Sequence, residues 1–184
     1  MKGTLGEKMV ELGMSSLATA FEVVKTIISV YDGYEKGRFM KCDEAVRAEI
    51  QRRCEMLTRH AEKLQSDVHK MKFTDARNSF NESIEMLQIF NNEVQFSISG
   101  NKVSLHKGIG NLNSGAVRKL VNHDSACLKS LVDCTNEANA IAEDITAKTQ
   151  ESILTAISNW NQSINRSRNR FLERNMYIDG LTKR

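Results

Sequence analysis

The feature that most restricts the fold of this chain is that proline is absent from all 184 positions. Average usage would place about nine prolines in a chain of this length. Proline removes a backbone donor and breaks helix interiors, so a chain without it suits a structure made mostly of helix interior. We therefore expect an all-α fold with few loops.

Apolar residues recur at alternating spacings of four and three in separate stretches, which places them on one face of a helix in each stretch. The first stretch is apolar around more than half of its circumference, which is typical of a helix with most of its surface covered. Phe21 and Ile28 lie on its stripe. The stretches predict helices over about 5–33, 42–73, 75–95 and 116–175.

A chain of 184 residues is long enough for one domain with a core and too short for two large ones. We expect a single domain over 1–184, built as an elongated bundle of four to five helices with coiled-coil-like packing. Thr74 and Asp75 offer an N-cap that would separate the second helix from the third. Since neither Gly nor Pro intervenes, one unbroken helix through residue 75 is the alternative.

The period changes near residue 94. Val94, Phe96 and Ile98 alternate with polar residues ahead of a turn-like stretch at Gly100 and Asn101. Such alternation predicts a small β-hairpin over about 94–105, and a fraying helix end followed by a loop is the alternative. The glycine-rich residues that follow predict a loop, so the loop or hairpin region covers 96–115.

The last stretch is too long for a compact domain. As one helix, the roughly 55 residues from Val117 to Phe171 would extend about 80 Å at 1.5 Å per residue, whereas a compact domain of this size has a radius of gyration near 16 Å, by general scaling. The stripe shifts phase at Thr149. Either the helix breaks, for which Thr135 to Asn139 is the expected place, or the molecule is elongated and needs a partner along its length. The second alternative favours a protein that works as a component of a larger assembly.

Few residues suggest chemistry. His123, Cys127 and Cys134 fall near one helix face and resemble part of a zinc site. Structural zinc needs four ligands, usually supplied as close pairs, and thiols filling an apolar seam are the favoured interpretation. No Glu-x-x-His pair for a di-iron centre is present, nor a phosphate-binding Gly-Lys-Ser/Thr loop or a Gly-x-Ser-x-Gly nucleophile motif. We expect a non-enzymatic protein without metal or cofactor.

The charge distribution leaves nucleic acid open as a partner. The net charge is +3, with basic residues concentrated in 36–72 and in a basic C-terminal tail over 166–184. Arg166 and Arg170 share a helix face and would reach phosphates together. Aromatic residues for base stacking are not interleaved with them, so a solvated or subunit-pairing face is favoured over nucleic-acid binding.

The hydropathy pattern and the cysteines bear on the location of the protein and on its contact with membranes. Glu7, Lys8 and Glu11 interrupt any signal-peptide core, and no stretch of about 18 uncharged apolar residues exists. The four cysteines lie in helix-like stretches without the spacing of a disulfide scaffold, which indicates reduced thiols and a cytoplasmic protein. A membrane-active helical protein, using the amphipathic first helix, is the third functional hypothesis.

The preferred function is a helical interaction protein that acts as a scaffold, adaptor or inhibitor. It would self-associate as a homo-oligomer, bind another protein, or do both. Polar residues within apolar seams fix register and partner choice in helical assemblies, and Asn91 and Asp124 occupy such positions. The expected interaction residues are Phe21, Ile28, Asn91, Asp124, Trp160, Ile164, Arg166, Arg170 and Phe171.

Overall fold

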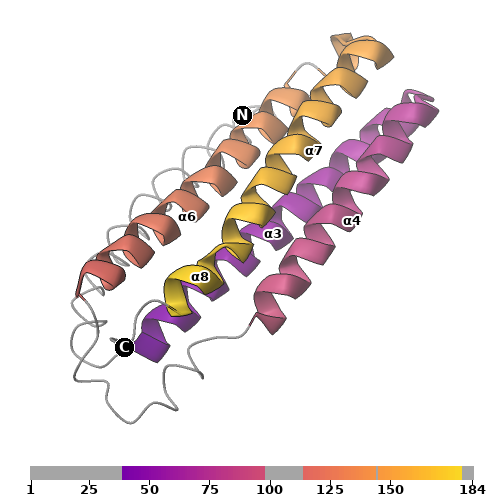
Figure 1. The fold of residues 1–184 in the computed structure, drawn as a ribbon. Helices are drawn as coiled ribbons and strands as arrows, with labels where there is room; N and C mark the ends of the chain where they lie inside the picture. The colour runs from indigo at the N-terminus through magenta and orange to yellow at the C-terminus, as the bar shows by residue number, and fades with distance from the viewer. Residues whose placement is uncertain (1–38, 98–113, 144, 180–184) are drawn as a thin grey trace, which may run out of the picture.

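The structure, a computed structural model, describes residues 39–97, 114–143 and 145–179. Its helices are α3 (Phe39–Lys70), α4 (Thr74–Phe96), α6 (Ser114–Ala142), α7 (Gln150–Leu172) and the short α8 (Arg174–Asp179), with a 3-10 turn η2 at Ile145–Ala147 (Figure 1). The helices pack against one another, which confirms the expected all-α helical bundle. No helix in the described ranges is long and apolar enough to cross a membrane.

The bundle consists of two antiparallel hairpins, α3 with α4 and α6 with α7, which lie side by side (Figure 1). They are stacked so that α4 contacts α7 and α3 contacts α6. In each of these two pairs, α4 with α7 and α3 with α6, the helices run parallel. Between α4 and α7, polar contacts join residues in the same order along both helices: Gln150 with Asp75, Asn161 with Ser83, and Arg168 with Glu93.

Each long helix buries one stripe, and the 4-3 spacing located these stripes closely. The buried residues of the stripe on α3 are Val46, Ile50, Cys54, Leu57, Ala61, Leu64 and Val68. On α6 they are Leu120, Asp124, Cys127, Leu131, Cys134, Ala138 and Ile141, and on α7 they are Ile153, Ile157, Trp160, Ile164 and Phe171. Because apolar residues spaced by four and three keep one face inward over several turns, all long helices contribute to one continuous core.

The turn between α3 and α4 decides the first alternative left open by the sequence, because the two helices are separate. Phe73 N–H donates to Val68 O at 3.1 Å and Lys72 N–H donates to His69 O at 2.9 Å. This pair of bonds is a Schellman motif, which requires a left-handed residue after the helix end. Lys72 adopts it with φ of 62°, although the position favours glycine. Phe73 then packs against the core.

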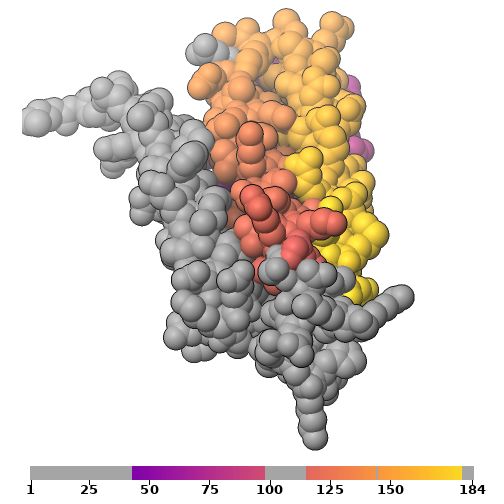
Figure 2. Space-filling model, turned by 60° about the vertical axis from the view of Figure 1, so that its left-hand side comes forward, coloured from indigo at the N-terminus to yellow at the C-terminus, as the bar shows by residue number. Residues whose placement is uncertain are grey.

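The stretch over 116–175 is not one continuous helix: of the two alternatives, the broken helix is observed, as the antiparallel helices α6 and α7. The break lies at 143–149, beyond the expected Thr135 to Asn139, which are helical. Lys148 Nζ donates to Ala140 O at 2.6 Å and so binds a carbonyl in the last turn of α6. Thr149 caps α7, its hydroxyl accepting from Ser152 N–H at 3.3 Å. Figure 2 shows α6 and α7 side by side along their length.

Other boundaries also differ from expectation. Helix α4 continues through Phe96, so residues 94–96 are helical and do not begin a hairpin. The remaining hairpin residues 98–105 and the predicted helix over 5–33 lie outside the described residues. Within the basic tail, the described residues from Arg166 to Asp179 belong to α7 and α8 and to the junction between them.

Candidate functional site

Four large apolar side chains are exposed in the described ranges, and all of them lie on α4, α7 and α8. Phe96 and Met176 are the most exposed, at 76% and 67%, and Ile89 and Leu172 are exposed to a lesser degree. Single exposed apolar residues are ordinary on protein surfaces, so their arrangement decides whether they matter.

Three of these side chains flank the Glu93–Arg168 ion pair between α4 and α7, and the fourth, Met176, lies on α8. Ile89, Glu93 and Phe96 are spaced by four and three residues, so they share one face of α4. Arg168 and Leu172 are four residues apart on α7 and share a face in the same way. Because Arg168 binds Glu93, the two faces meet, and Phe96 and Leu172 lie at the same level of the bundle. Met176 follows one turn later on α8. We call these six residues the α4/α7 outer face.

The ionic groups of this face bind each other. Arg168 Nε donates to Glu93 Oε2 at 2.6 Å, and Arg168 Nη2 donates to the other carboxylate oxygen. The hydrogen bond to Glu93 raises the pKa of the Arg168 guanidinium above its ordinary value. Such a two-point pair fixes the relative position of its helices. The outer face therefore combines exposed apolar side chains with a locally neutral, rigid ionic contact.

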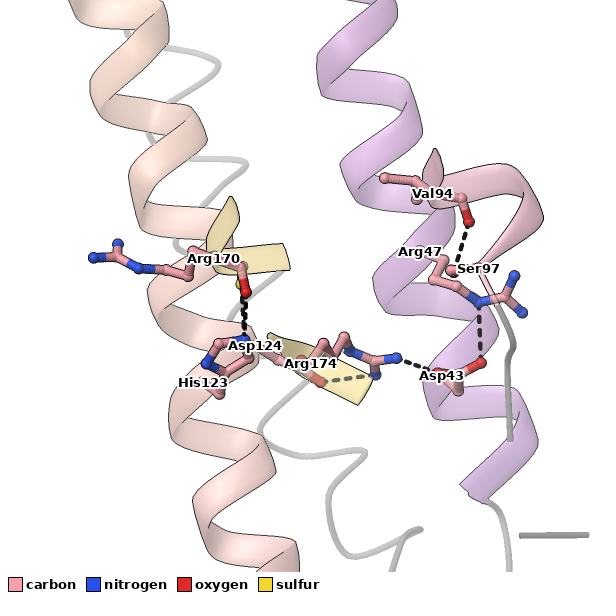
Figure 3. Close-up of polar contacts among 9 residues, drawn as sticks. Asp43, Arg47, Val94, Ser97, His123, Asp124, Arg170 and Arg174 are labelled. Carbon is pink, nitrogen blue, oxygen red and sulfur yellow. Dashed lines mark hydrogen bonds and ion pairs between the residues drawn. The ribbon is translucent and has the colours of Figure 1, made fainter. Parts of the chain in front are cut away.

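A second polar cluster is buried where α8 meets the bundle. The Arg174 guanidinium extends from α8 between Asp124 of α6 and Asp43 of α3 (Figure 3). Its Nε and Nη2 donate to the two oxygens of Asp124 at 2.7 and 3.0 Å, and its Nη1 donates to Asp43. Arg47 also donates to Asp43, at 3.0 Å. Two cations thus face two carboxylates, which satisfies the requirement that buried charges be paired.

His123 adds a second attachment for the C-terminal helices. Its Nε2 lies 2.8 Å from Arg170 O, and since a carbonyl only accepts, Nε2 carries the proton (Figure 3). The ring stacks on Tyr177 with centroids 4.4 Å apart. Cys127 Sγ lies 3.5 Å from the same nitrogen. His123 therefore positions the α7/α8 junction against α6.

The cysteines occupy the core as small apolar groups. Cys54, Cys127 and Cys134 are free and buried. Burial raises the pKa of the Cys54 and Cys127 thiols to about 12 and that of Cys134 to about 11. Cys134 lies 3.4 Å from the Ser167 hydroxyl, while Cys127 contacts His123. Among the described residues, His, Cys, Asp and Glu side chains do not gather into a group of three that could hold a metal ion.

Several of the predicted interaction residues are used inside the bundle. Trp160, Ile164 and Phe171 are buried, and the Trp160 indole donates to Cys134 O at 2.9 Å. Asp124 is fully buried against Arg174. These four residues stabilise the chain's own fold and are not available at its surface. Phe21 and Ile28 lie outside the described residues.

Asn91 occupies a position beside the core, between the buried Phe90 and Val94. Its Oδ1 is buried and has no hydrogen-bond partner within the part of the chain that the structure describes. The side chain as a whole is only half-buried. An unsatisfied buried acceptor costs free energy, so this residue weakens the bundle locally.

The four arginines between residues 166 and 174, which the structure describes, do not form one basic surface. Arg174 is buried between carboxylates, and Arg168 faces α4 and binds Glu93. Arg166 and Arg170 are exposed and face toward α6: Arg170 donates to Ala126 O at 3.3 Å. Arg166 donates to Ser163, which donates to Glu137 of α6. Two of these four cations are committed to ion pairs, and nucleic-acid binding stays a prediction.

No protein-family model matches the chain, and the searches of curated proteins and of solved structures likewise found no match. The candidate site is therefore defined by geometry alone. Local spacing does not single out Ile89, Leu172 and Met176 as exposed apolar residues, and it places Phe96 in a hairpin. One available signal was the seven-residue spacing of Ile89 and Phe96 off the core stripe of α4.

Proposed function

We propose that this protein is a non-enzymatic helical interaction protein, a scaffold, adaptor or inhibitor that works through helix packing and self-association. The observation that carries the proposal is the α4/α7 outer face, where Ile89, Phe96, Leu172 and Met176 expose apolar area around a neutral ion pair. Exposed apolar side chains that gather in one region, bordered by polar residues, mark interaction sites on folded proteins.

The length of the last helix no longer supports this proposal. One helix over 116–175 would have required a partner along its length, whereas α6 and α7 fold back on each other and bury their stripes within the chain. Self-association therefore rests on the outer face. It does not rest on Trp160, Ile164 or Phe171, which are buried in the bundle.

A non-enzymatic role is supported by how the titratable groups are used. His123 holds Arg170 O and stacks on Tyr177, and Arg174 and Asp124 bind each other in the interior. Groups held this way position helices and are poorly placed to exchange protons with a substrate. The buried free thiols fit a reducing compartment, so we include a cytoplasmic location in the proposal.

The proposal is tested by measuring the mass of the purified protein by light scattering across a wide range of concentrations, at low and high salt. The expected result is a mass above the chain mass of 20.8 kDa that rises with concentration and persists at high salt. Apolar contacts are strengthened or unchanged by salt, whereas purely ionic ones are screened. A 20.8 kDa species at every concentration, together with no protein captured from the native cell, would refute it.

A further inference from the structure

Two charged residues of α3 are buried although they lie beside its core stripe and not on it. Glu49 is 8% exposed and Arg53 is 5% exposed, and Arg53 Nε donates to Glu49 Oε1 at 2.7 Å. On α6, Leu128 also lies beside the stripe and is 2% exposed. The flanks of amphipathic helices ordinarily carry charge toward water. The burial of these three residues, which we call the α3/α6 flank, therefore requires a cover.

The α3/α6 flank lies on one side of the bundle and at one level. Each residue turns an α-helix by about 100°, and Glu49 and Arg53 each come one position before a stripe residue. His60 has the same kind of position, and its Nε2 lies 3.3 Å from Ala138 O of α6. The two charged residues therefore lie on the side of α3 that faces α6. Because α3 and α6 run parallel, equal counting back from His60 and Ala138 places Leu128 within one turn of both.

The other described helices lie away from this flank. Helix α4 is on the opposite side of the α3 stripe, where it accepts a hydrogen bond from Gln65. Helix α7 binds α6 through Glu137, which is half a turn around the helix from Leu128. Helix α8 binds α3 at Asp43, more than one turn before Glu49, and follows α7 toward the start of α6. Within the described ranges, α4, α7 and α8 therefore do not cover the α3/α6 flank.

We propose that residues 5–33 of the same chain cover the α3/α6 flank as a fifth helix of the bundle. The sequence predicts a helix there with an apolar face wider than half its circumference, which one neighbouring helix would not cover. Its predicted end comes just before the start of α3 at Phe39, and Gly33 and Gly37 suit a reversal of the chain between the two. The inference does not use the α4/α7 outer face, so it stands apart from the proposed function.

The stretch 98–113, which joins α4 to α6, is less suited to this position. It carries Gly100, Gly108 and Gly110, and each glycine within a helix costs about 1 kcal/mol relative to alanine. A covering helix is therefore expected from 5–33 and not from 98–113.

The connection to α3 determines which part of the segment would reach the flank. A reversal over 34–38 would make residues 5–33 antiparallel to α3. As a helix they would extend about 43 Å at 1.5 Å per residue, enough to pass the whole α3/α6 flank. Equal counting back and forward from the middle of 34–38 places Phe21 level with this flank. Phe21 lies on the apolar stripe of its segment, so it is the expected contact of Leu128.

Disulfide trapping in the full chain tests the proposal. Phe21→Cys is combined with Leu128→Cys in a Cys42→Ser background, oxidised glutathione is added as a mild oxidant, and peptide mass spectrometry identifies the residues that are joined. The matched control is Thr19→Cys with Leu128→Cys, because Thr19 lies about 200° around the predicted helix from Phe21. Circular dichroism checks that both variants keep their helix content. The other described cysteines are buried.

The expected result is a disulfide within one chain that forms at least about ten times faster with Phe21→Cys than with Thr19→Cys, because neighbouring groups have the higher effective concentration. If Leu128→Cys unfolds the chain, the pair Ile28→Cys with Val121→Cys decides, since Val121 is only half-buried. Equal rates for the two Leu128 pairs, or folded variants in which neither Phe21→Cys nor Ile28→Cys is joined to α6, would overturn the proposal. A disulfide found only between two chains would also overturn it, because the cover would then come from a second copy.

Discussion

Arg174 binds Asp124 through two N–H groups, at 2.7 and 3.0 Å, although 50 residues separate them along the chain. The same guanidinium also reaches Asp43, so three helices meet at one buried cation (Figure 3). Replacing Arg174 would leave two buried carboxylates facing each other with less compensation.

We therefore predict that Arg174→Leu lowers the free energy of unfolding by about 3–5 kcal/mol, because one partner of a buried ionic cluster is lost. Urea unfolding followed by circular dichroism measures the change. The control is Arg59→Leu, which removes an exposed ion pair to Glu55 at 3.9 Å and should cost less than about 1 kcal/mol. Similar losses for both variants would contradict the structural role of the cluster.

The buried thiols should be unreactive in the folded protein. With a pKa of about 12 for Cys54 and Cys127 and about 11 for Cys134, almost none of these groups is thiolate at pH 8. In a Cys42→Ser variant, a thiol-specific reagent at pH 8 should report little reaction until denaturant is added, and then three thiols. Immediate reaction of all three in the native protein would show that this part of the core is open.

His60 should make stability depend on pH in the mildly acidic range. Burial lowers the pKa of this imidazole, and its contact with Ala138 O at 3.3 Å only partly opposes that effect. The unfolded chain, with an ordinary histidine pKa near 6.5, takes up a proton that the folded state resists. The contribution of neutral His60 to the free energy of unfolding is thus present above pH 6.5. It is lost as the pH falls toward the lowered pKa that His60 has in the folded state.

The measurement is the free energy of unfolding between pH 7.5 and 5.5 for the wild type, His60→Gln and His69→Gln. We expect the decrease on acidification to be smaller in His60→Gln than in the wild type and in His69→Gln, the control at an exposed histidine of the same helix. An identical pH dependence in all three proteins would remove His60 as the cause.

Asn91→Leu should stabilise the protein. The buried Asn91 Oδ1 lacks a hydrogen-bond partner within the described residues, so its removal relieves a desolvation cost of about 1 kcal/mol or more. Thermal unfolding measures the gain, and the exposed neighbour variant Asn92→Leu should change stability little. If Asn91 instead fixes the register of a partner, the substitution would lower stability and alter the mass of the assembly.

How far the sequence predicts this structure depends on the range of the interactions. The stripe through Ile50, Cys54 and Leu57 follows from local helical spacing, and those residues are buried as predicted. In the sequence, only a phase shift of the apolar stripe at Thr149 marks the break at 143–149. Glycine or proline usually marks such a break, whereas here a threonine cap and a lysine bind the helix ends. Lys72 similarly took a turn position that favours glycine.

The candidate site was less predictable than the fold. Asp124 was recognised as a polar residue in an apolar seam, but its partner Arg174 depends on how three helices are arranged in space. Trp160 and Phe171 are of residue types that are common in protein interfaces. Such residues also fill the core of a single chain, and these two are buried there. Which apolar residues stay exposed depends on which helices pack against each other, and local spacing does not specify that packing.

Sedimentation equilibrium of Phe96→Glu against the wild type tests the central claim most directly, with Gln95→Glu as the matched control. A charge in place of Phe96, the most exposed apolar side chain of this face, opposes burial at an interface, so we predict that Phe96→Glu remains near 20.8 kDa while the wild type and Gln95→Glu form heavier species. Circular dichroism should show the same helix content in all three. A Phe96→Glu mass equal to that of the wild type would contradict the claim that the α4/α7 outer face joins two copies.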